Sequence, residues 1–220
     1  MLEFGWRAVT GDYVNVGLPL VTAFFVIWLI EGGFALARAV LTQMAREFGG
    51  TLIGPFTWVD VGWFPVSYLI GLALQAFILG GAARFSLDVA RGQKPEFGVV
   101  FSGGNYFLPM FAAHLIASIC VGLGLMLCVV PGIILSVGWM LATPLIVDRN
   151  RSATVALRES WQLTSGQRLD LFGYLLLMVG VAILGFFACC LGLVLLSLPV
   201  IAVSSASLYI RLTGEPIRTV

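Results

Sequence analysis

The sequence predicts an all-α protein that crosses a membrane several times, and three observations lead to this fold class. Of the 220 residues, 60% are hydrophobic and only 10% are charged. The mean hydropathy is +1.02, whereas a soluble domain carries about 25% charged residues. The long apolar runs are continuous, which is typical of membrane helices, because the strands of a membrane barrel alternate apolar and polar residues.

Six apolar segments approach the length of about 20 residues that a helix needs to cross ~30 Å of hydrocarbon. We expect them to form three helical hairpins in a single domain of residues 1–220, after a cytoplasmic N-terminal segment of residues 1–15. The fourth and sixth segments are short for a perpendicular crossing. The segments are Leu18–Leu41, Trp63–Ala83, Leu108–Val130, Ile133–Val147, Leu171–Leu191 and Val194–Ile210.

The first segment also resembles a secretion signal, because the small residues Ala35–Ala37 follow an apolar run. A cleaved signal has a basic start, whereas Glu3 and Asp12 outnumber Arg7 in front of this run. We therefore expect the segment to be retained as a membrane helix. Beyond it, residues 31–60 are expected to form an outer amphipathic segment and loop.

The third and fourth segments are separated only by Pro131-Gly132, which predicts a tight hairpin tip on the outer side of the bilayer. The fourth segment then ends abruptly in the charged sequence Asp148-Arg149-Asn150-Arg151. This order predicts that the apolar run crosses the membrane between the tip and the charges.

The distribution of Lys and Arg predicts the orientation, because cytoplasmic loops are enriched in both. The N-terminal segment and the connections after the second, fourth and sixth segments hold ten of the twelve basic residues, and only Arg38 and Arg46 lie on the opposite side. Both termini are therefore expected to be cytoplasmic. The ten are Arg7, Arg84, Arg91, Lys94, Arg149, Arg151, Arg158, Arg168, Arg211 and Arg218.

Residues 152–166 are predicted to form an inner amphipathic helix, with Ser152 as N-cap and Gly166 just beyond its end. Small and mostly apolar side chains recur on one face at helical spacing, which favours docking against the membrane bundle over a binding site for a soluble partner. The face comprises Ala153, Ala156, Leu157, Ser160, Trp161 and Thr164.

The stretch "PGIILSVGWMLATPLIVDRNRSATVALRESWQLTSGQR" resembles a signature of bacterial six-helix membrane proteins. This mostly uncharacterised group is related to the membrane domain of glycerophosphoryl diester phosphodiesterase. The resemblance implies a compact six-helix bundle. These 220 residues hold no soluble phosphodiesterase domain, so it does not imply hydrolysis. The matching positions are Pro131-Gly132-Ile133, Trp139, Leu141-Ala142, Pro144, Asp148, Ala156-Leu157, Ser160-Trp161 and Gly166.

Glu31, Gln75 and His114 are the candidate functional residues inside the membrane, where polar side chains are costly and often functional. Glu31 and Arg38 share one helix face, and the amphipathic pattern around them favours an interfacial pair over a proton relay. A lone polar side chain such as Gln75 or His114 more often bonds across helices than gates transport. The serines of the sixth segment either pack between helices or line a wet passage.

A cluster of mixed charge is predicted at the cytoplasmic side. The mixed signs favour ion pairs within the cluster, and binding of lipid headgroups is the second interpretation. Arg84, Asp88 and Arg91 share a helix face through their spacing of four and three residues. The full set is Arg84, Asp88, Arg91, Asp148, Arg149, Arg151, Arg158 and Arg168.

No catalytic motif, metal site or cofactor site is predicted. The four cysteines are Cys120, Cys128, Cys189 and Cys190, which lack metal-type spacing, and the chain has a single histidine. The cysteines are interpreted as small packing residues. A disulfide between Cys128 and Cys189 or Cys190 is left open.

These observations predict a non-enzymatic, oligomeric protein of the bacterial inner membrane that organises or shapes the bilayer or scaffolds partners. Its expected partners are membrane lipids and further copies of itself, and no protein partner is identified. The net charge of +1 and the lack of a basic arm argue against nucleic acid. The alternative is a channel or transporter for a small solute or lipid.

Overall fold

The computed structural model of the chain describes residues 2–47, 51–53, 56–93, 96–187 and 198–214. Nearly all described elements are helices, and the exception is a two-stranded antiparallel ribbon. The elements are α1 (Leu2–Gly11), the π-helical turn η1 (Tyr13–Gly17), α2 (Leu18–Glu47), β1 (Thr51–Ile53), β2 (Phe56–Thr57), α3 (Trp58–Ala90), the 3₁₀ segment η2 (Phe97–Tyr106), α4 (Phe107–Leu127), α5 (Val129–Trp139), α6 (Ala142–Arg149), α7 (Ala153–Leu163), α8 (Arg168–Phe187) and α10 (Leu198–Thr213).

The predicted helical membrane class is confirmed. Four helical runs in the described residues are long and apolar enough to cross a bilayer: Tyr13–Glu47, Trp58–Ala90, Phe97–Leu127 and Val129–Arg149. A fifth crossing is obtained if α7 and the start of α8, which meet at 105°, are taken together. The sixth segment stays a prediction, because α10 has 16 described residues and residues 188–197 before it lie outside the described part.

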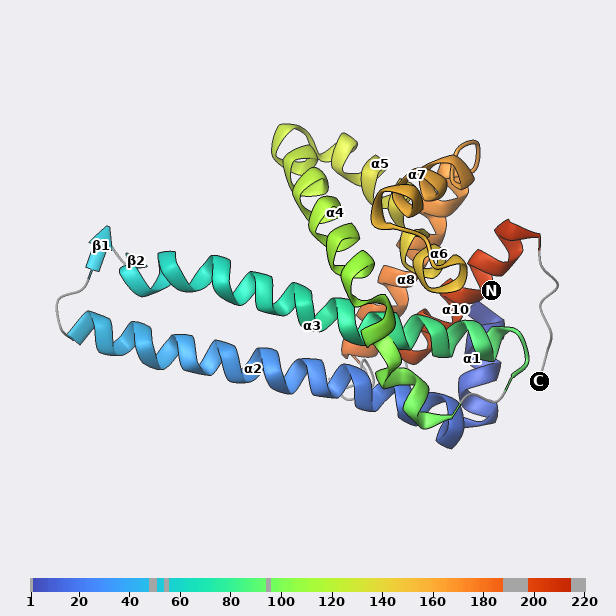
Figure 1. The fold of residues 1–220 in the computed structure, drawn as a ribbon, viewed down its shortest axis with the longest axis horizontal. Coiled ribbons are helices and arrows are strands. Elements are labelled where there is room, and N and C mark those ends of the chain that lie inside the picture. Colours follow the sequence, from blue (N-terminus) through green and yellow to red (C-terminus); the bar gives the residue numbers. More distant parts are fainter. Residues whose placement is uncertain (1, 48–50, 54–55, 94–95, 188–197, 215–220) are drawn as a thin grey trace.

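Helices α2 and α3 lie side by side as a long hairpin that extends away from the other helices (Figure 1). We call this pair the arm. Within the expected outer segment and loop of residues 31–60, α2 continues to Glu47 and the β1–β2 ribbon follows at the tip. Residues 31–47 contain no proline, and most of their side chains favour helix. At the tip, Thr57 and Asp60 form a capping box that starts α3.

The C-terminal half of α3 lies at the centre of the fold and contributes to two buried clusters. Leu87 and Ala90 pack with residues of α4, α6 and α10. Phe85 and Val89 pack with residues of α1, α2 and η2. Segment η2 lies directly against α3, where a β-carbon on Gly81 would overlap the Val100 carbonyl. Because these two backbones touch, only glycine fits at this position.

The turn between α4 and α5 differs from the prediction that Pro131-Gly132 forms its tip. The helix breaks three residues earlier, at Cys128, whose backbone is extended with φ −167° and ψ 143°. Pro131 lies in the first turn of α5. Proline is tolerated there because the N–H groups of the first turn have no partner within the helix. Gly132 is buried against α4, and a β-carbon there would meet Leu125. Pro131 therefore suits the start of α5, and Gly132 allows α4 and α5 to pack closely.

Helix α7 occupies the place of the predicted helix at residues 152–166, and Gly166 follows it with φ +92°. Its small face packs beneath the break between α5 and α6. The Ser160 hydroxyl donates to the Gly138 carbonyl at 2.7 Å and accepts from the Leu141 N–H at 3.2 Å. The Thr164 hydroxyl reaches the same Gly138 carbonyl at 3.3 Å. Ser160 of α7 and Thr164, which caps this helix, thus provide partners for backbone groups at the break.

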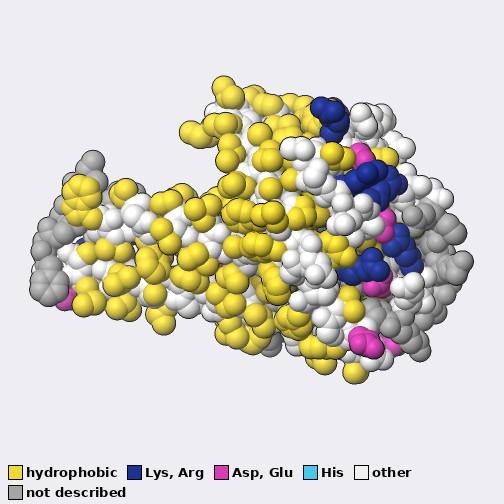
Figure 2. Space-filling model, in the orientation of Figure 1, with side chains coloured by type: hydrophobic (Ala, Val, Ile, Leu, Met, Phe, Trp, Pro, Cys, Tyr) yellow, Lys and Arg dark blue, Asp and Glu magenta, His cyan; other side chains and the backbone are white. Residues whose placement is uncertain are grey.

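The charged side chains gather at one end of the molecule, as Figure 2 shows for one face. Most of the visible basic and acidic atoms lie over the end that holds α6 and α7, whereas the arm is covered mainly by hydrophobic side chains. The long axis of the molecule therefore runs from a charged end to an apolar arm.

Candidate functional site

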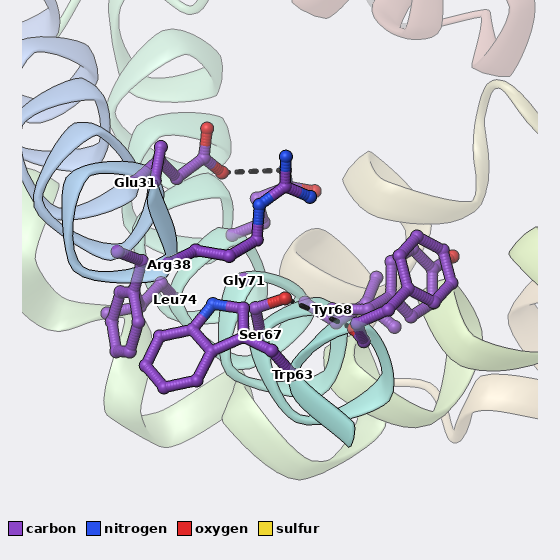
Figure 3. Close-up of a pocket in the computed structure, with 12 residues that line it drawn as sticks. Glu31, Arg38, Trp63, Ser67, Tyr68, Gly71 and Leu74 are labelled. Atoms are coloured by element: carbon purple, nitrogen blue, oxygen red, sulfur yellow. Dashed lines mark hydrogen bonds between the residues drawn. The ribbon is translucent and has the colours of Figure 1, made fainter. Parts of the chain in front are cut away.

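A cleft of about 410 Å³ lies between the two helices of the arm and holds two of the three predicted intramembrane residues (Figure 3). The Gln75 amide on α3 donates to Glu31 Oε1 on α2 at 3.3 Å. Arg38 lines the same cleft two turns beyond Glu31. The cleft therefore contains an acid, a base and an amide between two apolar helices.

Aromatic rings form much of the wall around these polar groups. The Phe34 and Trp63 rings meet across the two helices at a centroid distance of 6.1 Å, and the Phe64 and Tyr68 rings stack along α3 at 6.2 Å. Interleaving of aromatic rings with polar groups is typical of the membrane–water interface. These aromatic residues were not predicted as site residues, although the spacing of four between Phe64 and Tyr68 on α3 is a detectable signal.

The cleft floor is open because α3 has a glycine opposite the acid. A β-carbon placed on Gly71 would lie 3.9 Å from Glu31 Oε1, an ordinary contact distance. A larger side chain at this position would fill the cleft, so Gly71 sets its depth.

His114 is not part of this cleft. It lies on α4, where its Nδ1 is 2.9 Å from the Met110 carbonyl one turn earlier in the same helix. Among the α10 serines, Ser204 and Ser207 are buried and Ser205 is exposed. Ser197 lies outside the described residues. The described serines and His114 thus lie apart from the Glu31–Gln75 pair, and the structure does not join them into one polar path.

A second polar site links three elements at the charged end. Arg91, just after α3, pairs with Asp148 of α6 at 2.7 Å, and Tyr209 of α10 donates to the other Asp148 oxygen at 2.9 Å. Within α3, Arg84 pairs with Asp88 at 3.4 Å. Tyr209 was not among the predicted residues, although a phenol near the end of an apolar helix, close to the predicted charges, is a usable signal.

The other predicted charged residues surround α7. Arg149 and Arg151 both approach Glu159, at 3.8 Å and 3.2 Å. The Arg168 guanidinium lies over the Trp161 ring, 3.9 Å from its centroid. Arg158 is exposed. Two ion pairs at this end, Arg84–Asp88 and Arg91–Asp148, join members of the predicted set. The other two use Glu159, which the prediction did not include.

The described residues contain no group of three or more histidine, cysteine or acidic side chains that could hold a metal ion. Cys120 and Cys128 are free thiols. Cys189 and Cys190, the suggested disulfide partners of Cys128, lie outside the described residues.

Comparison with known proteins confirms the resemblance predicted from the sequence. Residues 104–212 match the family model of the membrane domain of glycerophosphoryl diester phosphodiesterase. The chain is also 23% identical to the uncharacterized protein Rv2560 of Mycobacterium tuberculosis, over 97% of this chain and 67% of that protein. No solved structure matches. The matched segment includes Asp148 and Tyr209, whereas the arm and its cleft precede it.

Proposed function

We propose, from the relationship of residues 104–212 to this membrane domain, that the chain is a non-enzymatic membrane protein that self-associates and organises the bilayer. The observation that carries this proposal is the arm. Its two helices leave the rest of the fold and expose large apolar side chains along their length (Figure 2). These include Phe25, Trp28, Leu29, Leu36, Val40, Phe64, Val66 and Leu69.

The polar content of the arm supports self-association over a lipid-covered monomer. Glu31 is exposed on α2, in the middle of an apolar helix. A charged group that faces lipid is costly to keep without a partner. A second copy that covers this face would remove part of that cost.

The orientation belongs to the same proposal. We place both termini and the charged end in the cytoplasm of a bacterial cell, with the arm tip on the outer side of the inner membrane. The excess of Lys and Arg at the charged end supports this orientation. The partners are then membrane lipids and further copies of the chain.

Cross-linking tests the proposed self-association. A photoreactive residue replaces Leu36 on the arm, and a control replaces Leu169 on α8, whose side chains are 68% and 83% exposed. Protein reconstituted in vesicles is expected to form dimers from position 36 and far fewer from position 169. Equal yields at both positions, or none at 36, would contradict association through the arm.

Membrane shaping has its own measurement. Vesicles that contain the protein are compared with protein-free vesicles of the same lipids by electron microscopy. We expect a shift in the vesicle diameter distribution that grows with the protein-to-lipid ratio. Identical distributions at all ratios would contradict the organising role.

The alternative function, transport of a small solute or lipid, is supported by the Glu31–Gln75 contact within the apolar helices. Solute flux into protein-containing vesicles is compared with flux into empty ones, with Glu31→Ala and His114→Ala as variants. Flux that exceeds the empty-vesicle rate and falls in the Glu31 variant would replace the organising role by transport.

A further inference from the structure

We propose that the cleft between α2 and α3 binds a phosphate ester that also carries an ammonium group. Arg38 contacts the phosphate and Glu31 contacts the ammonium. The proposal stands on the cleft itself and does not depend on self-association or on membrane shaping.

The first argument is the presence of two opposite charges that are not paired with each other. Glu31 and Arg38 line one cleft, both are exposed, and among the described residues no carboxylate lies within 4.0 Å of the Arg38 guanidinium. Their α-carbons are two turns apart, about 10.5 Å along the helix axis. A ligand with one charge would leave the other group without an opposite charge in the cleft. A ligand with both charges matches both.

The second argument is that the Glu31 carboxylate is already oriented in the absence of a ligand. The Gln75 amide holds Glu31 Oε1 at 3.3 Å, which leaves Oε2 free to accept a further hydrogen bond from an ammonium group. Gly71 keeps the space in front of the carboxylate open. Figure 3 shows the Glu31 carboxylate and the Arg38 guanidinium on the same side of the helix pair.

The third argument is the aromatic lining. Trp63, Tyr68 and Phe34 line the cleft beside the charges. Faces of aromatic rings attract ammonium groups, and tryptophan attracts them most strongly. Guanidinium groups match the geometry of phosphate oxygens and form charge-assisted hydrogen bonds with them. The lining therefore favours an amine-bearing phosphate ester over a plain phosphate.

Two sources of this chemistry are available: the headgroup of phosphatidylethanolamine, and a soluble phosphate ester such as phosphoethanolamine. The protein is purified in detergent, exposed to equal amounts of phosphatidylethanolamine and phosphatidylglycerol, and the lipids retained are counted by native mass spectrometry. Phosphatidylglycerol has the phosphate without the ammonium group. We expect the wild type to prefer phosphatidylethanolamine about ten-fold, as one charge-assisted hydrogen bond allows.

The variants separate the two contacts. Glu31→Gln is expected to abolish the preference while some binding of both lipids persists. Arg38→Gln is expected to weaken binding of both about ten-fold. The matched controls are Glu3→Gln and Arg7→Gln on α1, an exposed ion pair outside the cleft, and both should behave as wild type. Circular dichroism and gel filtration check that every variant keeps its helical fold.

A steric variant tests the same site without changing any charge. Gly71→Leu fills the cleft floor and should reduce retention of phosphatidylethanolamine, whereas Gly122→Leu, at an open position on α4, should not. No preference in the wild type, an unchanged preference in Glu31→Gln, or equal effects of both glycine variants would overturn the proposal.

Competition decides the source of the ligand. Phosphoethanolamine is added to protein already loaded with phosphatidylethanolamine. Displacement of the lipid supports a site that also takes the soluble ester. Retention of the lipid at all concentrations supports a site that needs the acyl chains as well. Either result supports the phosphate–ammonium pairing, provided that the Glu31→Gln variant loses its preference.

Discussion

At the scale of single residues, the break between α5 and α6 is held by side chains that come from outside both helices. The Gly138 carbonyl accepts hydrogen bonds from Ser160 and Thr164, and Trp161 covers the α-carbon of Gly138. Ser160 and Trp161 belong to α7 and Thr164 caps its C-terminal end, so this helix and the helix break depend on each other.

Gly138→Ala should destabilise the protein, because a β-carbon at this position would overlap the Trp161 ring. Overpacking of this kind costs about 1–3 kcal/mol. We expect a lower thermal midpoint in detergent. The matched control is Gly122→Ala, where no atom lies within 4 Å of the new β-carbon, and it should be neutral or slightly stabilising. Equal midpoints for the two variants would contradict the packing of Trp161 on Gly138.

Ser160→Ala removes both the donor to Gly138 and the acceptor for the Leu141 N–H. A buried backbone group left without a partner costs about 1–3 kcal/mol. Hydrogen exchange at Leu141 should accelerate, and the midpoint of unfolding should fall. In Ser165→Ala the lost hydroxyl is exposed and bonds only to the Gln162 carbonyl, so little change is expected.

At the scale of elements, Asp148 ties together helices that are distant in the sequence. It lies on α6, accepts from Arg91 at the end of α3, and accepts from Tyr209 on α10. Tyr209 belongs to the buried cluster that joins α3, α4, α6 and α10, so the contact with Asp148 connects this cluster to the charged end. The half of the arm toward its tip, in contrast, has only the opposite arm helix as a packing partner (Figure 1).

Tyr209→Phe should loosen the docking of α10, because the fully buried ring keeps its shape and loses only the hydrogen bond to Asp148. Hydrogen bonds to charged groups contribute about 1.5–3 kcal/mol. The expected loss of unfolding free energy is measured by chemical denaturation in detergent. Tyr106→Phe is the control, since the Tyr106 hydroxyl bonds to no described residue. A loss as large in the control would contradict the role of the Asp148 contact.

The elements were predictable from the sequence where the pattern that specifies them lies within a single helix. Continuous apolar runs predicted the membrane helices, and the spacing of small residues predicted the buried face of α7. The Pro-Gly tip was misplaced because proline fits the first turn of a helix as well as a turn. The Glu31–Gln75 contact was out of reach, because the two residues are 44 positions apart and no local pattern sets which helix faces meet.

At the scale of the whole molecule, charge is separated along the long axis. The ion pairs gather at the end where α6, α7 and the end of α3 meet, and the arm tip lies at the opposite end (Figures 1 and 2). A charged end that continues into long apolar helices is an arrangement that a bilayer and its aqueous border stabilise together.

Cysteine labelling of intact cells tests the proposed orientation. The four native cysteines are replaced by alanine, and one new cysteine is placed at Gln43 near the arm tip or at Arg158 on α7, both of which are exposed. A membrane-impermeant reagent should label position 43 in intact cells and position 158 only after permeabilisation. The reverse pattern would invert the orientation.

The length of the arm has a consequence for the membrane that holds it. Helix α2 has 30 residues and α3 has 33, about 45 Å and about 50 Å, whereas the hydrocarbon layer is about 30 Å thick. Helices longer than this layer must tilt or extend their far ends into water. The difference between helix length and layer thickness sets how far they tilt. The tilt angle of this hairpin should therefore depend on bilayer thickness, and lipids with longer acyl chains should reduce it.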